Sequence, residues 1–300
     1  RNNISPETGL AREWPSAGPK VLWTAPLGEG YASPSVRDGE VYVLDREGEA
    51  RDILRCYALD SGKELWNYAY DAPGNVSHGG SRTAPTVTET HVYTVGLFGD
   101  FLCVDRKTHA PVWQRNILKE NGLDVPGWGV SQAPLLYGDL VIVAPQAPEA
   151  FVAAYNKATG EPVWKTSSLG AVGYSTPVLA KLCGVDQLLQ VGASTKDGET
   201  KGLTAGISPV DGKILWMELD VSFDYRRRGR LWMRSADLLR NRRQHPRGFW
   251  VPGAADAFQY YLIKKLDKVN IDARQANCLA GLVGEDPDQA RQAVGLPSID

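Results

Sequence analysis

Length, composition and charge narrow the classes of protein to which this chain can belong. Its 300 residues are enough for one large or two modest domains, and they carry a formal net charge of −2. This near balance gives no sign of a nucleic-acid or membrane partner, and no run of about 18 apolar residues exists that would span a membrane. The content of 31 Gly, 19 Pro, 9 Trp and 12 Tyr favours many short strands joined by turns.

Residues 1–18 predict an irregular leading segment, because they are polar and contain turn signals such as Ser5-Pro6 and Gly18-Pro19. No signal peptide is present in this chain. The chain begins at Arg1 rather than Met, so a leader could precede it and the compartment stays open on this evidence.

A strand–turn–strand pattern recurs along the chain from residue 19 to residue 219. Residues 154–164 form a strand, a tight Thr-Gly turn and a second strand ending in Trp, and the same pattern returns at 103–113, at 206–216 and, two residues shorter, at 58–66. The Trp positions, spaced 43 to 52 residues apart, are Trp23, Trp66, Trp113, Trp164 and Trp216. The turn glycines are Gly62, Gly160 and Gly212, and His109 takes this position in the copy at 103–113. Such a period fits one four-stranded propeller blade.

Proline marks a second position of each repeat. Pro34, Pro85, Pro134 and Pro177 each follow a Gly-rich loop and precede a Val-rich hairpin. A proline at the start of a strand costs no ladder hydrogen bond. Each unit is therefore predicted to be a Pro-led strand, a hairpin to a second strand, and two more strands joined by the Thr-Gly turn. Lys20-Val21-Leu22-Trp23 resembles the last strand of a repeat whose earlier strands are missing.

This A-x-D/N-x-x-T-G-x-x-x-W pattern with its Pro-led strands resembles the repeat of the PQQ-like (quinoprotein dehydrogenase-like) β-propeller family. The resemblance covers residues 19–219 and implies an all-β fold with a ring of about eight blades, closed by pairing the N-terminal strand with the last blade. The chain shows about four blades, a partial ring. Family members include extracytoplasmic binding proteins, among them an outer-membrane-assembly lipoprotein, so the resemblance also implies a periplasmic location.

Residues 220–300 do not continue the repeat, and nothing in them resembles a known family. Nine Arg crowd into residues 224–247, and the apolar spacing after Ala254 predicts a mostly helical tail. The Arg cluster raises a nucleic-acid-binding hypothesis. We favour the alternative of a solvated or disordered basic segment, because no RNA- or DNA-binding motif is present.

The loops before each Pro are the candidate binding site, because a propeller gathers such loops at the mouth of its central channel. Their side chains suited to a ligand are Tyr31, His78, Arg82, Trp128, Gln132 and Tyr174. A planar aromatic or anionic ligand, or a protein partner, would suit this set. The alternative is that the aromatic rings pack between blades and that Arg82 pairs with a nearby carboxylate.

The chain lacks the motifs that catalysis in the family would require. Quinoprotein dehydrogenases are expected to hold PQQ between a Trp and a vicinal Cys-Cys disulfide, beside Ca²⁺ and a catalytic Asp. Here no two cysteines are adjacent, and none shares a CxxC spacing with another: they are Cys56, Cys103, Cys183 and Cys278. We therefore expect no metal site, and no cofactor unless PQQ with Ca²⁺ binds in another way.

Three functions follow from these observations. The first is a non-enzymatic binding or scaffold protein that presents its loops to a ligand or protein partner. The second is a PQQ-dependent alcohol oxidoreductase, whose catalytic residues the sequence does not identify. The third is nucleic-acid binding through residues 224–247.

Overall fold

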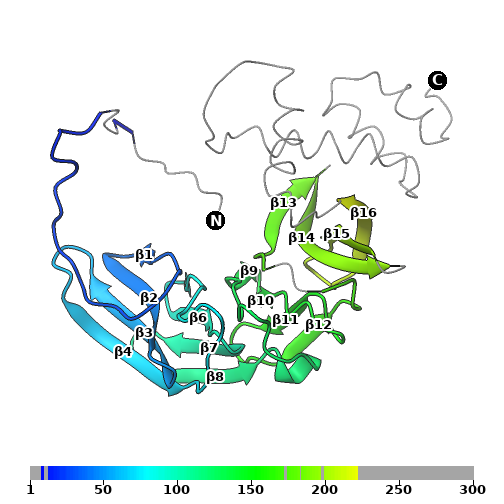
Figure 1. The fold of residues 1–300 in the computed structure, drawn as a ribbon, viewed down its shortest axis with the longest axis horizontal. Helices are drawn as coiled ribbons and strands as arrows, with labels where there is room; N and C mark the ends of the chain where they lie inside the picture. The colour runs from blue at the N-terminus through cyan, green and yellow to red at the C-terminus, as the bar shows by residue number, and fades with distance from the viewer. Residues whose placement is uncertain (1–7, 10–12, 172–173, 183, 197–198, 222–300) are drawn as a thin grey trace. The chain divides into compact units, whose positions relative to one another are not determined.

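A computed structural model describes residues 8–9, 13–171, 174–182, 184–196 and 199–221. Within these residues the protein is formed by four four-stranded antiparallel sheets, each with its strands in chain order (Figure 1). The predicted all-β class and the four blades are confirmed. The Arg-rich segment and the helical tail expected within residues 220–300 lie outside the described residues. Of that range the structure describes only Asp220 and Val221, which end the last strand of the fourth sheet.

The sheets are called blades 1 to 4. Blade 1 contains β1 (Ser35–Arg37), β2 (Glu40–Glu47), β3 (Arg51–Ala58) and β4 (Glu64–Asp71), and blade 2 contains β5 (Thr86–Val87), β6 (His91–Val95), β7 (Asp100–Asp105) and β8 (Pro111–Asn116). Blade 3 contains β9 (Leu135–Tyr137), β10 (Leu140–Val143), β11 (Ala153–Asn156) and β12 (Pro162–Lys165). Blade 4 contains β13 (Val178–Leu182), β14 (Val185–Lys196), β15 (Glu199–Ile207) and β16 (Ile214–Val221). A short 3₁₀ turn, η1 (Lys119–Asn121), follows β8.

Each of the four marker prolines immediately precedes the first strand of a blade. Pro34 precedes β1, Pro85 precedes β5, Pro134 precedes β9 and Pro177 precedes β13. A proline at this position removes no donor from the ladder, because hydrogen bonding begins one residue later. The sequence pattern thus fixes where each blade begins.

The turn between the third and fourth strands has the same geometry in all four blades. Gly62, Gly160 and Gly212 have φ values of 69°, 74° and 72°, in the left-handed region that glycine enters without a steric penalty. In each blade the register between these strands shifts directly after the residue opposite the Trp: Cys56, Cys103, Ala154 or Gly206. Blade 4 has a second shift, between Gly202 and Thr204. The repeat is therefore a repeat of backbone geometry as well as of sequence.

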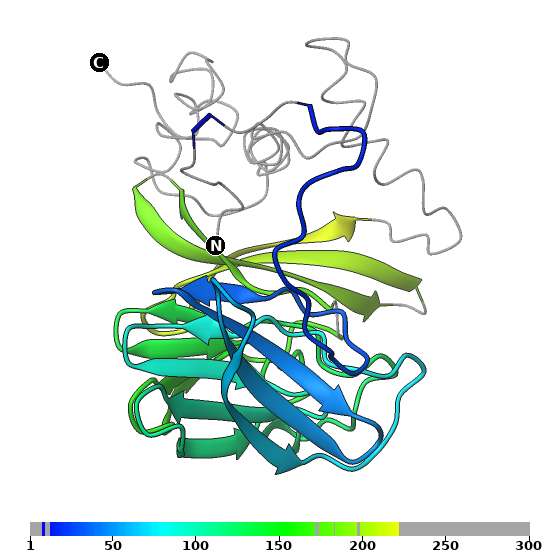
Figure 2. The same cartoon turned by 90° about the vertical axis from the view of Figure 1, so that its left-hand side faces the viewer.

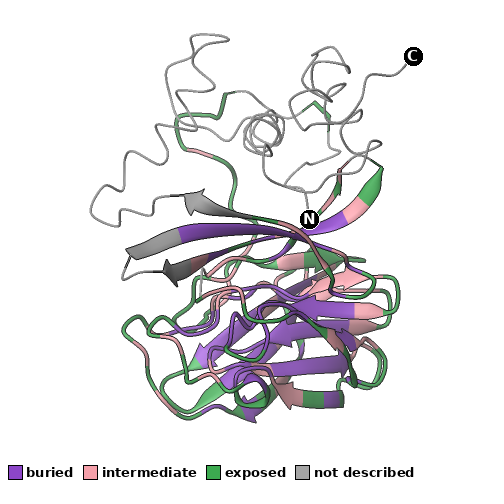
Figure 3. Cartoon of the chain, turned by 90° about the vertical axis from the view of Figure 1, so that its right-hand side faces the viewer, coloured by how far each residue is buried: buried purple, intermediate pink, exposed green. Residues whose placement is uncertain are grey.

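Neighbouring blades share apolar cores. Tyr42 and Leu54 of blade 1 pack in one cluster with Leu102 of blade 2. Phe101 of blade 2 packs in a second cluster with Tyr155 of blade 3, and a third cluster joins blades 3 and 4. Figure 3 shows the buried residues concentrated on the strands, with exposed residues at the turns. Since a four-stranded sheet cannot bury both of its faces alone, each blade depends on its neighbours.

The Trp that ends one repeat packs on the turn of the following blade. A Cβ added to Gly160 would lie 2.7 Å from Cδ2 of Trp113, and a Cβ added to Gly212 would lie 2.4 Å from Cε3 of Trp164. The indole Nε1 of Trp113 also donates to the carbonyl oxygen of Lys157 at 3.1 Å. Glycine is needed at the turn for two reasons, the positive φ and the ring that lies against it.

His109 replaces this glycine in blade 2. Its φ is 59°, a conformation that costs a residue with a Cβ about 1 kcal/mol or more. The imidazole ring stacks on the indole of Trp66, with centroids 4.8 Å apart and an interplanar angle of 12°. The ring contact therefore offsets the strain of the turn.

The prediction of a strand at residues 20–23 is wrong. Residues 19–28 form no strand in the structure, because no neighbouring strand within the described residues pairs with them. They run beside blade 1 (Figures 1 and 2). Trp23 nevertheless takes the place of a preceding repeat's Trp: its Nε1 donates to the carbonyl oxygen of Leu59 at 2.8 Å, and its ring covers Gly62.

Candidate functional site

The loops that precede the marker prolines lie next to one another. The backbone N–H of Tyr31 donates to the carbonyl oxygen of Ser81 at 2.7 Å, which joins the N-terminal segment to the loop of residues 78–82. The hydroxyl of Ser77 donates to the carbonyl oxygen of Gly127 at 3.1 Å, which joins that loop to the next. The structure thus brings together five of the six predicted side chains, here called the loop cluster: Tyr31, His78, Arg82, Trp128 and Tyr174.

Arg82 occupies the middle of the loop cluster. Its guanidinium carbon lies 5.1 Å from the centroid of the Tyr31 ring, and its N–H groups donate to the carbonyl oxygens of Gly80, at 2.8 Å, and His78. Partial burial lowers the pKa of Arg82, while the hydroxyl groups of Tyr31 and Tyr174 act in the opposite direction. An arginine keeps its charge at neutral pH in any case, so the cluster contains one fixed cation.

Trp128 and Tyr174 form the second half of the loop cluster. Their ring centroids are 5.1 Å apart with the planes tilted by 38°, and the Trp128 side chain is 41 % exposed. Tyr174 has a φ of 51°, which is rare for a bulky residue and places backbone strain at this loop. The protein therefore holds an aromatic pair at the surface at some cost in backbone energy.

The other two predicted residues differ from each other in position. His78 is exposed, and its carbonyl oxygen accepts a hydrogen bond from Arg82. Gln132 is only 6 % exposed. Its side-chain amide donates to the carbonyl oxygen of Ala144 and accepts from the N–H of Ala144, so this buried residue ties the loop to the chain directly after β10.

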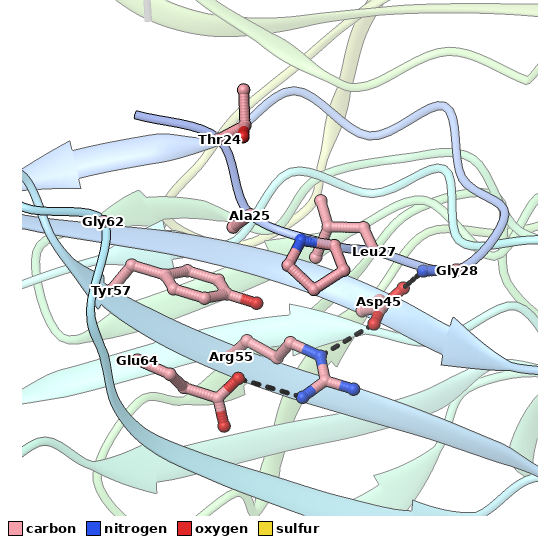
Figure 4. A pocket seen from close by; sticks show the side chains of 10 residues that line it. Thr24, Ala25, Leu27, Gly28, Asp45, Arg55, Tyr57, Gly62 and Glu64 are labelled. Atoms are coloured by element: carbon pink, nitrogen blue, oxygen red, sulfur yellow. Dashed lines mark hydrogen bonds and ion pairs between the residues drawn. The ribbon is translucent and has the colours of Figure 1, made fainter. Parts of the chain in front are cut away.

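A second hollow lies on blade 1, away from the predicted residues. It has a volume of about 440 Å³ and lies between residues 24–28 and the sheet (Figure 4). Arg55 projects into it from β3 and pairs with Asp45 at 2.7 Å and Glu64 at 3.0 Å. Tyr57 and Leu27 complete the wall shown in the figure.

One residue of the sequence, Arg55, could have indicated this hollow, although the repeat spacing did not point to it. Arg55 precedes Cys56, the small residue opposite Trp66, and Leu102 and Ala205 hold the same place in blades 2 and 4. Those two side chains are fully buried against a neighbouring blade. A charged residue at a position that is apolar in blades 2 and 4 fits a face of blade 1 that no other blade covers within the described residues.

The described cysteines do not form a cofactor clamp. Cys56 and Cys103 are free and completely buried in the cores of two different blades, and burial raises the pKa of each thiol to about 12. No group of three or more His, Cys, Asp or Glu side chains that could hold a metal ion occurs in the part of the chain that the structure describes. In that same part, no helix has the length and apolar character needed to cross a membrane.

Comparison with known proteins agrees with the fold. The sequence profile of the family described as outer membrane protein assembly factor BamB matches residues 50–226. The quinoprotein alcohol dehydrogenase PedH of Pseudomonas putida is 25% identical over 171 residues, which make up 55% of this chain and 27% of that protein.

The solved structures that are similar to this chain include a BamB and a quinohemoprotein alcohol dehydrogenase. BamB from Moraxella catarrhalis has 20% sequence identity and a TM-score of 0.46, covering 65% of this chain and 53% of that one. The quinohemoprotein alcohol dehydrogenase from Comamonas testosteroni has 14% identity and a TM-score of 0.48, covering 65% and 36%. The chain thus spans about a quarter of the length of PedH and about half that of the BamB structure.

Proposed function

Because this chain belongs to the BamB-like family of PQQ-type β-propeller repeats, we propose that it is a non-enzymatic binding or scaffold protein that docks a protein partner on its loop cluster. By the same family membership, we propose a periplasmic or otherwise extracytoplasmic location. BamB is named as an outer membrane assembly factor, so a role in holding other proteins at the cell envelope is the version of this function that the family favours.

The observation that carries the proposal is the grouping of exposed Tyr31 and Trp128 with the partly buried Arg82 on adjacent loops. Tyr31 is 63 % and Trp128 41 % exposed, and both touch another member of the loop cluster. Tyr, Trp and Arg are the residue types that dominate the binding energy of protein interfaces. The loops that carry Arg82, Trp128 and Tyr174 each begin and end on paired strands, and the backbone hydrogen bond to Ser81 holds Tyr31 beside them.

The shape of the site favours a protein over a small molecule. The cleft beside Tyr174 has a volume of only about 10 Å³, whereas pockets for small ligands enclose roughly 300–1,000 Å³. A ligand at the loop cluster would thus remain largely open to solvent. A folded partner can cover such a surface and exclude water from its centre.

The alternative, a PQQ-dependent alcohol oxidoreductase, draws its support from the similarity to PedH. The residues described here do not fit that cofactor. Its clamp requires two adjacent cysteines, and Cys56 and Cys103 lie in separate apolar cores. We therefore propose that the chain needs no PQQ, and we derive no redox step.

Capture of a partner from an envelope extract tests the proposal. Trp128→Ala should lower the amount captured about tenfold or more, because a central aromatic residue contributes a large share of binding energy. Leu65→Ala is a matched control: Leu65 lies on β4, away from the loops, and is 47 % exposed. Equal capture by wild type and Trp128→Ala, with both proteins folded by thermal unfolding, would place any partner elsewhere.

A further inference from the structure

Arg82 offers a positive charge and unused hydrogen-bond donors at the surface. A guanidinium has five N–H donors, and the two acceptors that the structure gives Arg82 are the backbone carbonyls of Gly80 and His78. Within the described residues it forms no ion pair, unlike Arg46, Arg55, Arg106 and Arg115, each of which contacts a carboxylate. Its charge is left for a ligand.

The surroundings of Arg82 restrict what that ligand can be. The Tyr31 ring covers one side of the guanidinium, and the Trp128–Tyr174 pair lies nearby. A planar guanidinium flanked by aromatic rings is suited to the planar, bidentate carboxylate group. A polypeptide that covers these exposed rings would exclude water from the guanidinium, which would strengthen the attraction between opposite charges.

The other ionisable groups of these loops do not neutralise the site. The carboxylate of Glu29 lies over Gly79, but it forms no ion pair with Arg82 in the described structure. The His78 ring contacts the hydroxyl of Ser77 at 3.3 Å. Arg82 therefore remains the group that an incoming anion would meet.

We infer that the loop cluster binds a carboxylate of the partner polypeptide, with the carboxylate on Arg82 and a neighbouring apolar side chain against Trp128 and Tyr174. This inference rests on the proposed function and specifies its chemistry. The carboxylate can belong to an acidic side chain or to a C-terminus, since both present the same two oxygen atoms.

Three labelled hexapeptides distinguish these sources in a fluorescence-anisotropy titration of the full chain. The first peptide alternates Asp and Phe and is amidated at its C-terminus. The second is also amidated and has Asn in place of each Asp. The third has the same sequence as the second but a free C-terminal carboxylate. We expect a carboxylate peptide to bind about tenfold more tightly than the amidated Asn peptide, as a charge-assisted hydrogen bond would give. The difference should shrink as salt is added.

Substitutions at Arg82 connect this preference to one side chain. Arg82→Gln should remove the preference, and Arg82→Lys should keep part of it, because lysine retains the charge without the planar fork. Arg115→Gln is the matched control: Arg115 also lies over a tyrosine ring, that of Tyr155, at 5.6 Å. It should leave the preference unchanged.

The outcomes separate this inference from the proposed function. Equal affinity for all three peptides, with binding still lost in Trp128→Ala, overturns the carboxylate inference and leaves the docking surface standing. A preference that survives Arg82→Gln also overturns it. If no peptide binds and Trp128→Ala captures as much partner as wild type, both proposals fail.

Discussion

At the scale of single residues, the repeat is explained by one contact, that of an indole ring with the turn of the next blade. Trp23, Trp113 and Trp164 each lie against a turn glycine, and Trp66 stacks on His109. The small side chain at the turn is therefore a packing requirement as well as a conformational one. The residues that define the family pattern serve the fold, and none of them belongs to the loop cluster.

Two matched substitutions separate the conformational requirement for a positive φ from the packing requirement set by the indole ring. Gly138 has a φ of 57° with open space around it, whereas Gly160 has a φ of 74° and faces Trp113. Gly138→Ala should cost about 1–2 kcal/mol of unfolding free energy through its backbone alone. Gly160→Ala should cost about 1–3 kcal/mol more, because its Cβ would displace the indole. Denaturant unfolding of both variants measures the difference, and equal costs would refute the packing role of Trp113.

At the scale of elements, the turn between the third and fourth strands also depends on a side-chain acceptor. In blade 2, Oδ1 of Asp105 accepts hydrogen bonds from the backbone N–H groups of Lys107 and Thr108 at 2.8 and 2.7 Å. In blade 3, Oδ1 of Asn156 does the same at 2.9 and 3.1 Å. The D/N alternative in the repeat thus reflects a shared acceptor.

The acid sensitivity of this turn can be predicted. The backbone N–H groups of Thr108 and Lys107 lower the pKa of Asp105, so the folded state favours the charged form. The stabilisation is present above the unfolded-state pKa of about 3.9 and is lost as pH falls through the lower folded-state pKa. Asp105→Asn keeps the acceptor without the charge. Between about pH 7 and about pH 2.5, denaturation midpoints should fall less in this variant than in wild type; identical falls would contradict the assignment.

The sequence predicts the strands and turns well where the backbone preference of a single residue determines the local structure. Pro34 and Gly160 mark a strand start and a turn by their own backbone preferences, so the blades could be placed from spacing. Residues 20–23 were misassigned because a strand also needs a hydrogen-bonding neighbour, which their own sequence cannot reveal. The same limit applies to Arg55, because the hollow beside it depends on which segments pack on that face of blade 1, and in the described part of the chain these are residues 24–28.

The candidate site was predictable in part. Equivalent loops of a repeat must lie at the same end of their blades, and the contacts of Tyr31 with Arg82 and of Trp128 with Tyr174 follow from that placement. Gln132 sits in the same loop as Trp128, yet its amide turns inward to Ala144. Spacing gives the position of a loop residue, whereas the direction of its side chain depends on the surrounding packing.

At the scale of the whole molecule, we propose that the blades serve the fold and that the loop cluster, without a cofactor, serves binding. PQQ with Ca²⁺ should therefore leave the melting temperature unchanged and give no alcohol-dependent dye reduction. A specific ligand at one hundred times its Kd would stabilise the fold by about 2.7 kcal/mol, a shift that a thermal unfolding scan detects. A PQQ-dependent rise in melting temperature, or dye reduction, would revive the oxidoreductase alternative.

Amide hydrogen exchange of the chain with and without its captured partner shows whether the loop cluster is the docking surface. We expect slower exchange on binding in the loops around Tyr31, Arg82, Trp128 and Tyr174, with the turns around Gly62 and Gly160 unchanged. Protection confined to those turns or to the blade strands, with the loops exchanging as in the free protein, would contradict it.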